Sequence, residues 1–396
     1  MNLGLSKKCW LLFHRAISYS QLLGFHRPER LSPAETDEER HRRNQSWLSL
    51  CTGDVFTSLI LGLPYAGNAR TIPLTQSQHS LVTLLQHRLI LISAKVIDRN
   101  QMGLSLSISE TQAIQDEIET ATKDLDETFW NSPAALMSGK ISHSEYLDQI
   151  GAQCWFYQIL VLLHMPLMIH SVEDVHLAKH RTACLDATRN LLKIYHIMRS
   201  DALSAFSMDK LIDYQAFVCS ALLILGLLGF GGYETANQDK DRDLIRQTVT
   251  TLRHVSGTVN NPVASQALQG LESLMLLDSE HCPGQSGASC GNPFVKIMVP
   301  HVGTVTISPG EYLTSQRSTS TSPSTHMPPV FALSYDIFEQ PPANFPASET
   351  PLDGGQANGS DLADNMLSEQ RFIDFDWTTA IMPNFENDWA WLNDLN

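Results

Sequence analysis

The sequence predicts an all-α fold, with one large multi-helix domain followed by a mostly disordered C-terminal tail. Apolar residues recur about every three to four positions through most of the first 277 residues, which is the helical period. Convincing strand alternation is absent from this body, and no strict repeat of the length typical of solenoids is present. Near Asp278 the helical periodicity ends, and Gly, Ser, Pro and Thr become the main residues.

This change in composition divides the chain into three parts. Residues 1–277 are the helical body, residues 278–350 are a largely disordered linker rich in Gly, Ser and Pro, and residues 351–396 are an acidic and aromatic tail. Inside the linker, Val295 to Ile307 contains enough β-branched residues to favour a short strand pair. Ser315 to Ser360 has the composition of a disordered segment.

The charge balance limits the partners of the chain. It has 27 Lys and Arg against 42 Asp and Glu, a net charge of −15, which argues against general attraction to nucleic acid phosphates or anionic membranes. The most apolar run, Ala216 to Phe230, is about fifteen residues long, whereas roughly 20 are needed to span a bilayer. No signal peptide is recognisable, so we expect a soluble protein with no membrane partner.

The cysteines indicate neither a zinc site nor a disulfide framework. Seven are scattered without a CxxC pair, and structural zinc sites usually need closely spaced thiolates. Cys51, Cys154, Cys184 and Cys219 fall at apolar positions of helical patterns, which is typical of small buried hydrophobic residues. An odd number without a framework is typical of a reducing compartment.

The first two helices have clear signals. The second is predicted to begin with Ser32 as N-cap, Pro33 at its first position and Glu35 at its third, and to end at Gly62 and Pro64. The first is predicted to bury one apolar stripe, made of Cys9, Leu12, Phe13, Ala16, Ile17 and Leu23.

Charges on the second helix favour ion pairs along one face. Glu38 and Glu39 stand four residues before Arg42 and Arg43, which is the spacing of helical neighbours. Trp47 continues this helix into the core.

Later helices are marked by caps, prolines and apolar runs. Ser109 and Gln112 form a capping-box pattern, and Pro166 interrupts an apolar run, so a kink or break is expected there. Asn261 and Pro262 start the last helix. The apolar runs are Leu81 to Val96, Ile114 to Phe129, Tyr146 to Ile169, Leu185 to Met198, Phe217 to Leu228, Leu244 to Val255 and Ala267 to Met275.

Short motifs follow one another along this body in a set order. Their residues are Gly24, His26, Arg27, Arg42, Arg43, Trp47, Asp54, Gly62, Pro64, His164, Pro166, Asp213, Gln215 and Phe217. In this order and at these separations, the motifs resemble the middle homology region of fungal zinc-cluster transcription factors. The resemblance covers roughly residues 9–277.

The resemblance implies a helical regulatory domain in a nuclear protein, with shuttling to the cytoplasm left open. The partners it implies are the transcription machinery or a coactivator, another zinc-cluster factor, and a small-molecule effector. In the family a six-cysteine zinc module precedes this region, and no such module is present in this sequence. We therefore expect no cofactor in this chain, no metal site and no direct DNA contact.

Three positions depart from the family pattern. Val55 and Leu63 stand where the family has Arg, and Trp47 stands alone where the family has two tryptophans. These departures weaken the polar network that the resemblance implies.

The tail fits a transactivation segment. From Pro351 onward it has nine acids and one base, Arg371; the acids keep the aromatic side chains accessible, so that they can anchor in a partner's groove as an induced helix. The alternative is a helix that docks back on the body. The aromatic candidates are Phe372, Phe375, Trp377, Phe385, Trp389 and Trp391.

Two possible metal sites have simpler explanations. His176 and His180 are four residues apart, but no third ligand accompanies them, and we expect a solvated helix face. His281, Cys282 and Cys290 lie in a Gly-rich loop without metal-ligand spacing.

Phosphate and nucleotide sites are also disfavoured. Arg40, Arg42 and Arg43 could bind phosphate, but their acidic neighbours favour an ion-pair network. Gly229 to Gly232 follows a helix rather than a strand and lacks GxGxxG, so it is interpreted as a helix stop.

The leading hypothesis is a transcription regulator of the zinc-cluster type that acts through its helical domain and its tail. The alternative is an interaction partner of a complete zinc-cluster factor, without its own DNA contact. A third hypothesis, an all-α enzyme or small-molecule binder, is weaker. Asp124 and Asp126 lie on an ordinary charged helix face rather than in a magnesium-binding cluster, and neither GxSxG nor HExxH occurs. We expect no catalytic residues.

Overall fold

The body of the protein is helical, which confirms the all-α prediction for this region. The computed structural model describes residues 3–27, 35–67, 80–170, 175–200, 210–227, 237–258, 261–279, 295–299, 303–309 and 331–336. The helices are α1 (Leu3–Leu22), α2 (Asp37–Leu61), α3 (Leu81–Gln101), α4 (Ile108–Thr122), α5 (Glu127–Trp130), α6 (Ser132–Met137), α7 (His143–His170), the 3-10 helix η2 (Val175–Leu177), α8 (Ala178–Met198), α9 (Leu211–Leu227), α10 (Gln238–Thr258) and α11 (Pro262–Ser279).

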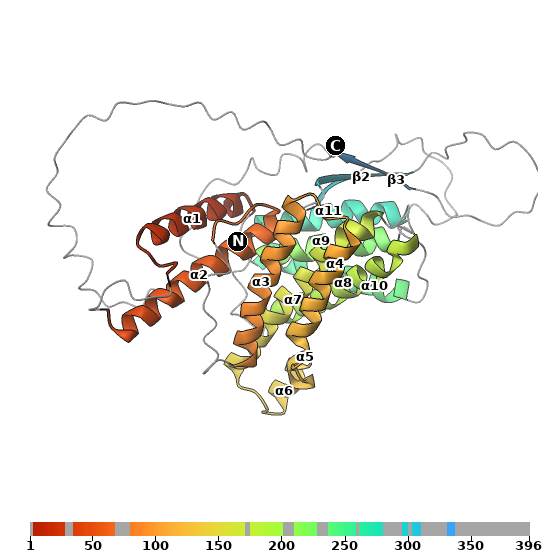
Figure 1. The fold of residues 1–396 in the computed structure, drawn as a ribbon. Helices are drawn as coiled ribbons and strands as arrows, with labels where there is room; N and C mark the ends of the chain where they lie inside the picture. The colour runs from red at the N-terminus through yellow and green to blue at the C-terminus, as the bar shows by residue number, and fades with distance from the viewer. Residues whose placement is uncertain are drawn as a thin grey trace, which may run out of the picture.

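Two apolar helices form the centre of the body. Every residue of α9 except Gly226 is buried, including the apolar run predicted from Phe217 onward. α9 packs against α8, α10 and α11, and α7 packs against α8 and α3. Figure 1 shows α1 and α2 at one side of this assembly and α5 and α6 at its lower end. One continuous apolar core runs from Val55 in α2 to Leu274 in α11.

α7 is long and apolar enough to cross a membrane, by length and composition, among the helices that the structure describes. The window that passes this test lies in His143–Ile169, and 89% of it is buried inside the protein. This burial is the pattern of a core helix. The cysteines predicted to be buried, Cys51, Cys154, Cys184 and Cys219, are all buried.

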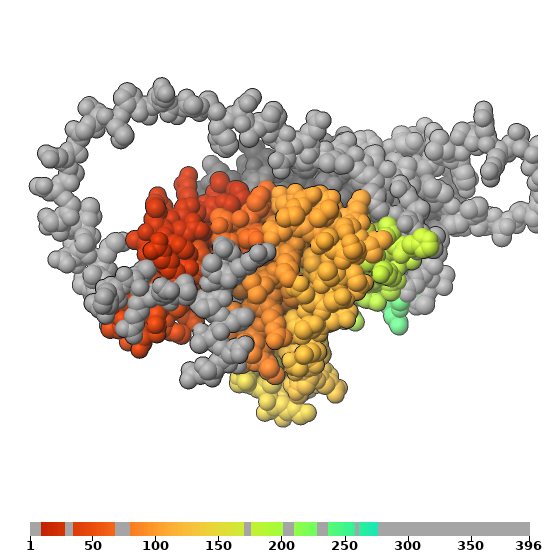
Figure 2. Space-filling view, viewed as in Figure 1, coloured from red at the N-terminus to blue at the C-terminus, as the bar shows by residue number. Residues whose placement is uncertain are grey.

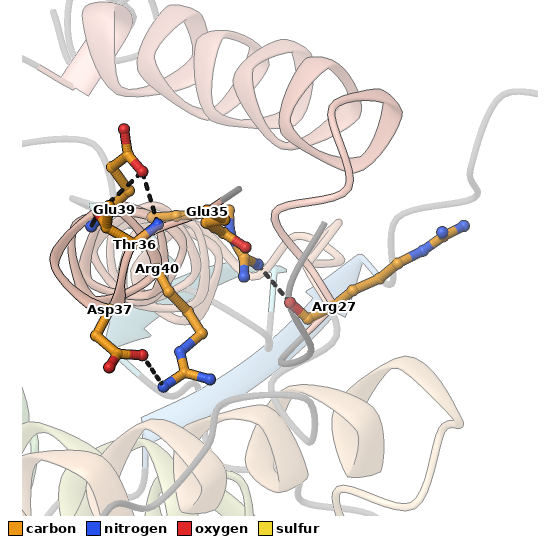
Figure 3. A network of polar contacts seen from close by, with 7 residues as sticks. Arg27, Glu35, Thr36, Asp37, Glu39 and Arg40 are labelled. Carbon is orange, nitrogen blue, oxygen red and sulfur yellow. Dashed lines mark hydrogen bonds and ion pairs between the residues drawn. The ribbon is translucent and has the colours of Figure 1, made fainter. Parts of the chain in front are cut away.

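The start of α2 differs from the prediction. Its N-cap is Thr36, whose Oγ1 accepts from the Glu39 N–H (3.2 Å), while the Glu39 carboxylate accepts from the Thr36 N–H (2.8 Å; Figure 3). The helix therefore begins at Asp37, and Ser32 is not its cap. A complete capping box satisfies two free N–H groups at once, which accounts for the later start. The end at Gly62 is confirmed, with φ 69° in the left-handed region that favours glycine.

The starts of α4 and α11 also test predicted N-terminal caps. α4 is capped by Ser107, whose Oγ accepts from the Glu110 N–H (3.3 Å), so the prediction of Ser109 as cap is wrong by two residues. α11 begins at Pro262 as predicted, with Asn261 Oδ1 accepting from the Ala264 N–H (3.1 Å).

Pro166 does not break α7, contrary to one of the two expected outcomes. The helix continues to His170, although a proline lacks the N–H that would bond the carbonyl four residues before it. The next carbonyl, that of Leu163, accepts a hydrogen bond from Arg99 Nη1 in α3 (3.0 Å). A side chain of α3 thus binds the α7 backbone within one turn of Pro166.

The first helix buries only part of its predicted stripe. Cys9, Phe13 and Ile17 are buried, whereas Leu12 and Leu23 are 55% and 64% exposed. α1 packs mainly against α2, so only one face of it is covered.

Beyond the body, the structure describes an antiparallel sheet in the order β1-β2-β3. Its strands are β1 (Val295–Val299), β2 (Gly303–Pro309) and β3 (Phe331–Asp336). Val295 pairs with Ile307 at one end of the β1–β2 hairpin, which is where β-branched residues favour a strand pair. β3 lies within the stretch whose composition is typical of disorder.

The contact between α9 and α11 can be tested at Gly270. A Cβ atom at this position would lie 2.8 Å from Cε2 of the buried Phe217 ring. We expect Gly270→Ala to lower the free energy of unfolding by about 1–3 kcal/mol, because an added methyl group displaces packed neighbours. The matched control is Gly151→Ala in α7, where no atom lies within 4 Å of the new Cβ. This change should raise the free energy of unfolding by roughly 0.5–1 kcal/mol. Urea denaturation followed by circular dichroism measures both, and equal effects would contradict the close contact.

Candidate functional site

Several motif residues of the body lie in four polar clusters at the ends and crossings of helices. The first cluster holds the turn that follows α2. The Asp54 side chain is fully buried, and its Oδ2 accepts from the N–H groups of Ala66 (2.7 Å) and Gly67 (2.9 Å). His14 Nε2 in α1 lies 3.4 Å from Asp54 Oδ1. Burial raises the pKa of the Asp54 carboxyl, while the two N–H groups and His14 act in the opposite direction.

The carbonyl groups of this turn are bound as well. Pro64 O accepts from Trp10 Nε1 (2.8 Å) and from Ser58 Oγ (3.1 Å), and Gly62 O accepts from Gln101 Nε2 (3.0 Å). The turn therefore joins α1, α2 and α3. Trp10 was missed by the sequence reasoning, because its partner is a backbone carbonyl more than fifty residues away.

The second cluster connects the end of α1 to α2. Arg43 is buried and pairs with Glu35 (2.9 Å), and it also donates to the Arg27 carbonyl (Figure 3). The expected pairing of Arg43 with Glu39 is replaced, since the Glu39 carboxylate caps the helix and Glu35 precedes it. The Arg27 side chain is exposed and points away from this network (Figure 3).

Trp47 fills the space between α1 and α2. It is buried against Ile17 and Cys51 in a small separate core, and its ring meets that of His26 edge to face at 6.2 Å between centroids. Gly24 is buried in the turn after α1 with φ 80°. Arg42 is exposed, so two adjacent arginines of one motif have different surroundings.

The third cluster contains an unexpected pair of histidines. His164 Nδ1 lies 3.1 Å from His180 Nδ1, and His164 Nε2 lies 3.2 Å from Gln115 Oε1. His180 is buried, so the prediction that it lies on a solvated helix face is wrong; His176 is exposed. The cause is the packing of α8 against α7, which turns His180 toward the core. Burial lowers the pKa of His164 to about 3, with His180, Arg99 and Lys179 adding to the effect, and burial also lowers the pKa of His180.

The fourth cluster is centred on Asp213 at the start of α9. Its Oδ1 accepts from Arg199 Nε (2.9 Å) and the Tyr195 hydroxyl (3.1 Å), and its Oδ2 accepts from Arg199 Nη2 (2.8 Å) and Asn261 Nδ2 (2.7 Å). One fully buried carboxylate thus fixes the end of α8, the start of α9 and the cap of α11. Burial raises the pKa of Asp213, and the guanidinium of Arg199 opposes that rise.

The other residues of the same motif are packed into the core. Cys154 Sγ lies 3.8 Å from Gln215 Oε1, and Phe217 meets Gly270 across the α9–α11 contact. These positions hold helices together.

One pocket lies beside the turn after α2. It has a volume of about 410 Å³ and is lined by Tyr65, Asp98 and Gln101 among others. The Tyr65 hydroxyl donates to Asp98 Oδ2 (3.2 Å) across this wall.

Several predicted sites lie outside the described residues. His281, Cys282, Cys290 and the six aromatic residues of the tail all fall there. Within the described ranges, no group of three or more His, Cys, Asp or Glu side chains is placed to hold a metal ion.

The fold and these clusters define a helical scaffold whose motif residues join helices, and comparison with known proteins indicates its class. The chain is 25% identical over 343 residues to transcription factor sdnS of Sordaria araneosa, which covers 81% of this chain and 44% of that relative. It is 24% and 25% identical to the dehydrocurvularin biosynthesis regulators of Alternaria cinerariae and Aspergillus terreus, over 70% and 72% of this chain and 38% and 41% of theirs.

These relatives confirm the predicted resemblance: the chain is similar to fungal transcription factors and regulators. It spans less than half the length of each of them. Their names are those of transcription factors or regulators, and none is that of an enzyme. No protein-family model matches the chain, and no solved structure matches it significantly.

The Asp213 cluster can be tested by removing its charge. We expect Asp213→Asn to lower the free energy of unfolding by about 3–5 kcal/mol, because the buried Arg199 guanidinium would lose the negative charge of Asp213. Asp243→Asn is the matched control, since Asp243 pairs with Arg246 on the surface of α10, where both side chains are more than half exposed; its effect should stay below about 1 kcal/mol. Urea denaturation measures both, and a small effect of Asp213→Asn would show that the cluster does not hold the helices together.

The histidine pair predicts a loss of stability in acid. The folded protein keeps His164 neutral down to a pKa of about 3, whereas a histidine in the unfolded chain takes up a proton near pH 6.5. Its contribution is therefore fully present above about pH 6.5 and is lost as the pH falls toward 3, by about 1.4 kcal/mol per pH unit. Between pH 6 and 5, the free energy of unfolding of His164→Gln should fall less steeply than that of the unmodified protein, by about 1.4 kcal/mol per pH unit.

The control for this measurement is His143→Gln, which replaces an exposed histidine at the start of α7. Its curve should follow that of the unmodified protein. If His164→Gln keeps the full slope, His164 is not the group that couples stability to pH.

Proposed function

We propose that this protein is a fungal transcription regulator in which the helical body serves as a regulatory and interaction domain and residues 351–396 serve as a transactivation segment. The observation that carries the proposal is the similarity, over 70–81% of this chain, to proteins named as fungal transcription factors and regulators. The acidic and aromatic composition of the tail supports the second part.

In this proposal the protein acts in the nucleus through protein partners, namely the transcription machinery or a coactivator and another zinc-cluster factor. The body performs no chemistry, and DNA contact is assigned to no residue of this chain. Its function is to change which surfaces are available when an effector binds one of its states more tightly than another.

The transactivation part can be tested with the tail alone. We expect residues 351–396, fused to a heterologous DNA-binding domain, to activate a reporter gene in a fungal host. The same fusion with Phe372, Phe375, Trp377, Phe385, Trp389 and Trp391 replaced by Ala is the matched control, and it should lose most of the activity, because aromatic anchors supply the contacts with a partner's groove. Normal expression without reporter activity would remove transactivation from the proposal.

A further inference from the structure

The outer side of α1 is an apolar surface that nothing in the described structure covers. Cys9, Phe13 and Ile17 are buried toward α2. The exposed apolar side chains are Leu11, Leu12, Tyr19, Leu22 and Leu23. At about 100° per residue, these five and Arg15 fall within an arc of roughly 120° on the side opposite to the buried residues. We call these six residues the α1 face.

The α1 face is an interaction surface by its composition. Single exposed leucines are common on proteins, but a contiguous exposed apolar patch usually marks a binding site. Here Leu22 is 85% and Tyr19 67% exposed. α1 lies at the edge of the body in both views (Figures 1 and 2), so a partner can approach it from outside.

The charges around this face select an acidic partner. Arg15 belongs to this face, and α1 contains no acidic residue; Arg27, shortly after it, is exposed. A second copy of α1 packed on this face would bring like charges together, which is unfavourable. An apolar segment with flanking carboxylates complements both the apolar side chains and the positive charge of the α1 face.

The C-terminal tail of this chain has that chemistry. Phe385, Trp389 and Leu392 are spaced as i, i+4 and i+7, so they would share one side of a helix, as anchors do in helix-in-groove recognition. Glu386 and Asp388 stand between these anchors.

The connection between body and tail is long enough for the two to meet. The sheet β1–β3 lies between Ser279, the end of α11, and Phe385. The roughly 50 residues from Asp336 to Phe385, as a coil, span about 35–42 Å on average. A helical body of this size has a radius of gyration of roughly 18 Å. The tail can therefore reach α1 within the same molecule.

We propose that the acidic-aromatic tail docks on the α1 face of its own chain as an amphipathic helix. In this arrangement Phe385, Trp389 and Leu392 contact Tyr19 and the exposed leucines, and the carboxylates of the tail lie near Arg15. The proposal builds on the proposed function, because the docked tail would hide the aromatic side chains that a transcriptional partner needs. The docking itself is a binding event that can be measured without any reporter gene.

The test uses the full chain with a photocrosslinking amino acid, p-benzoylphenylalanine, in place of Tyr19. After irradiation at low protein concentration, mass spectrometry should find crosslinks within one chain to residues 385–392. Replacing Phe385, Trp389 and Leu392 by Ala, or introducing Leu22→Glu, should reduce the crosslink yield at least about tenfold, which corresponds to losing one well-buried apolar contact. Added salt should lower the yield further, because the charges lie at the surface.

Met137→Glu is the matched control for Leu22→Glu. Met137 is 90% exposed at the end of α6, which lies at a different end of the body from α1 (Figures 1 and 2). This change should leave the crosslink yield unaltered. An equal loss with Met137→Glu would overturn the assignment of the α1 face, since the loss would then come from added charge in general.

The other outcomes also decide the question. Crosslinks between two chains, whose yield rises with concentration, would assign the face to a second copy and overturn docking of the tail. Crosslinks to another segment, or none, would overturn it as well. If the tail fusion activates a reporter but the full chain gives no crosslink, the docking is rejected and transactivation stands. If the full chain gives the crosslink but the fusion is inactive, the docking stands and transactivation is rejected.

Discussion

The whole body depends on the burial of two mostly apolar helices, α9 along nearly its whole length and α7 from Gln149 to Ile169. A helix with an apolar stripe needs one partner, but α7 and α9 must be surrounded on every side. α8 packs against both of them, α3 covers α7, and α10 and α11 cover α9. The other helices are placed by this requirement. α1 touches neither central helix closely and packs mainly on α2, which is why one of its faces is left open.

Polar side chains inside this core decide which helices meet. A buried polar group without a partner is costly, so Asp213 can be buried only where Arg199, Tyr195 and Asn261 converge on it. The motif residues thus act as connections at helix ends. This explains why residues spread over most of the body can share a pattern without forming one site: each cluster holds a different crossing.

The departures from the family pattern have a structural counterpart at the turn after α2. Val55, where the resemblance leads one to expect Arg, is fully buried in the apolar core. Asp54 beside it is held by two backbone N–H groups and by His14 of α1. The carboxylate therefore keeps a role without an arginine partner, and α1 becomes part of the connection. The same arrangement fixes α1 in the orientation that presents its outer face to solvent.

The helical body, the buried cysteines and some helix ends could be predicted from the amino-acid sequence, because they depend on neighbouring residues; examples are the left-handed Gly62 and the cap at Asn261. Periodicity and capping act within one or two turns, so they can be recognised locally. Three features could be seen only in the folded molecule: α7 continues through Pro166, His180 is buried beside His164, and Leu12 is exposed. These outcomes depend on which helix lies opposite, and that partner is set by the packing of distant segments around the two central helices. The order of motifs could therefore be read from the chain, but their separation into four clusters could not.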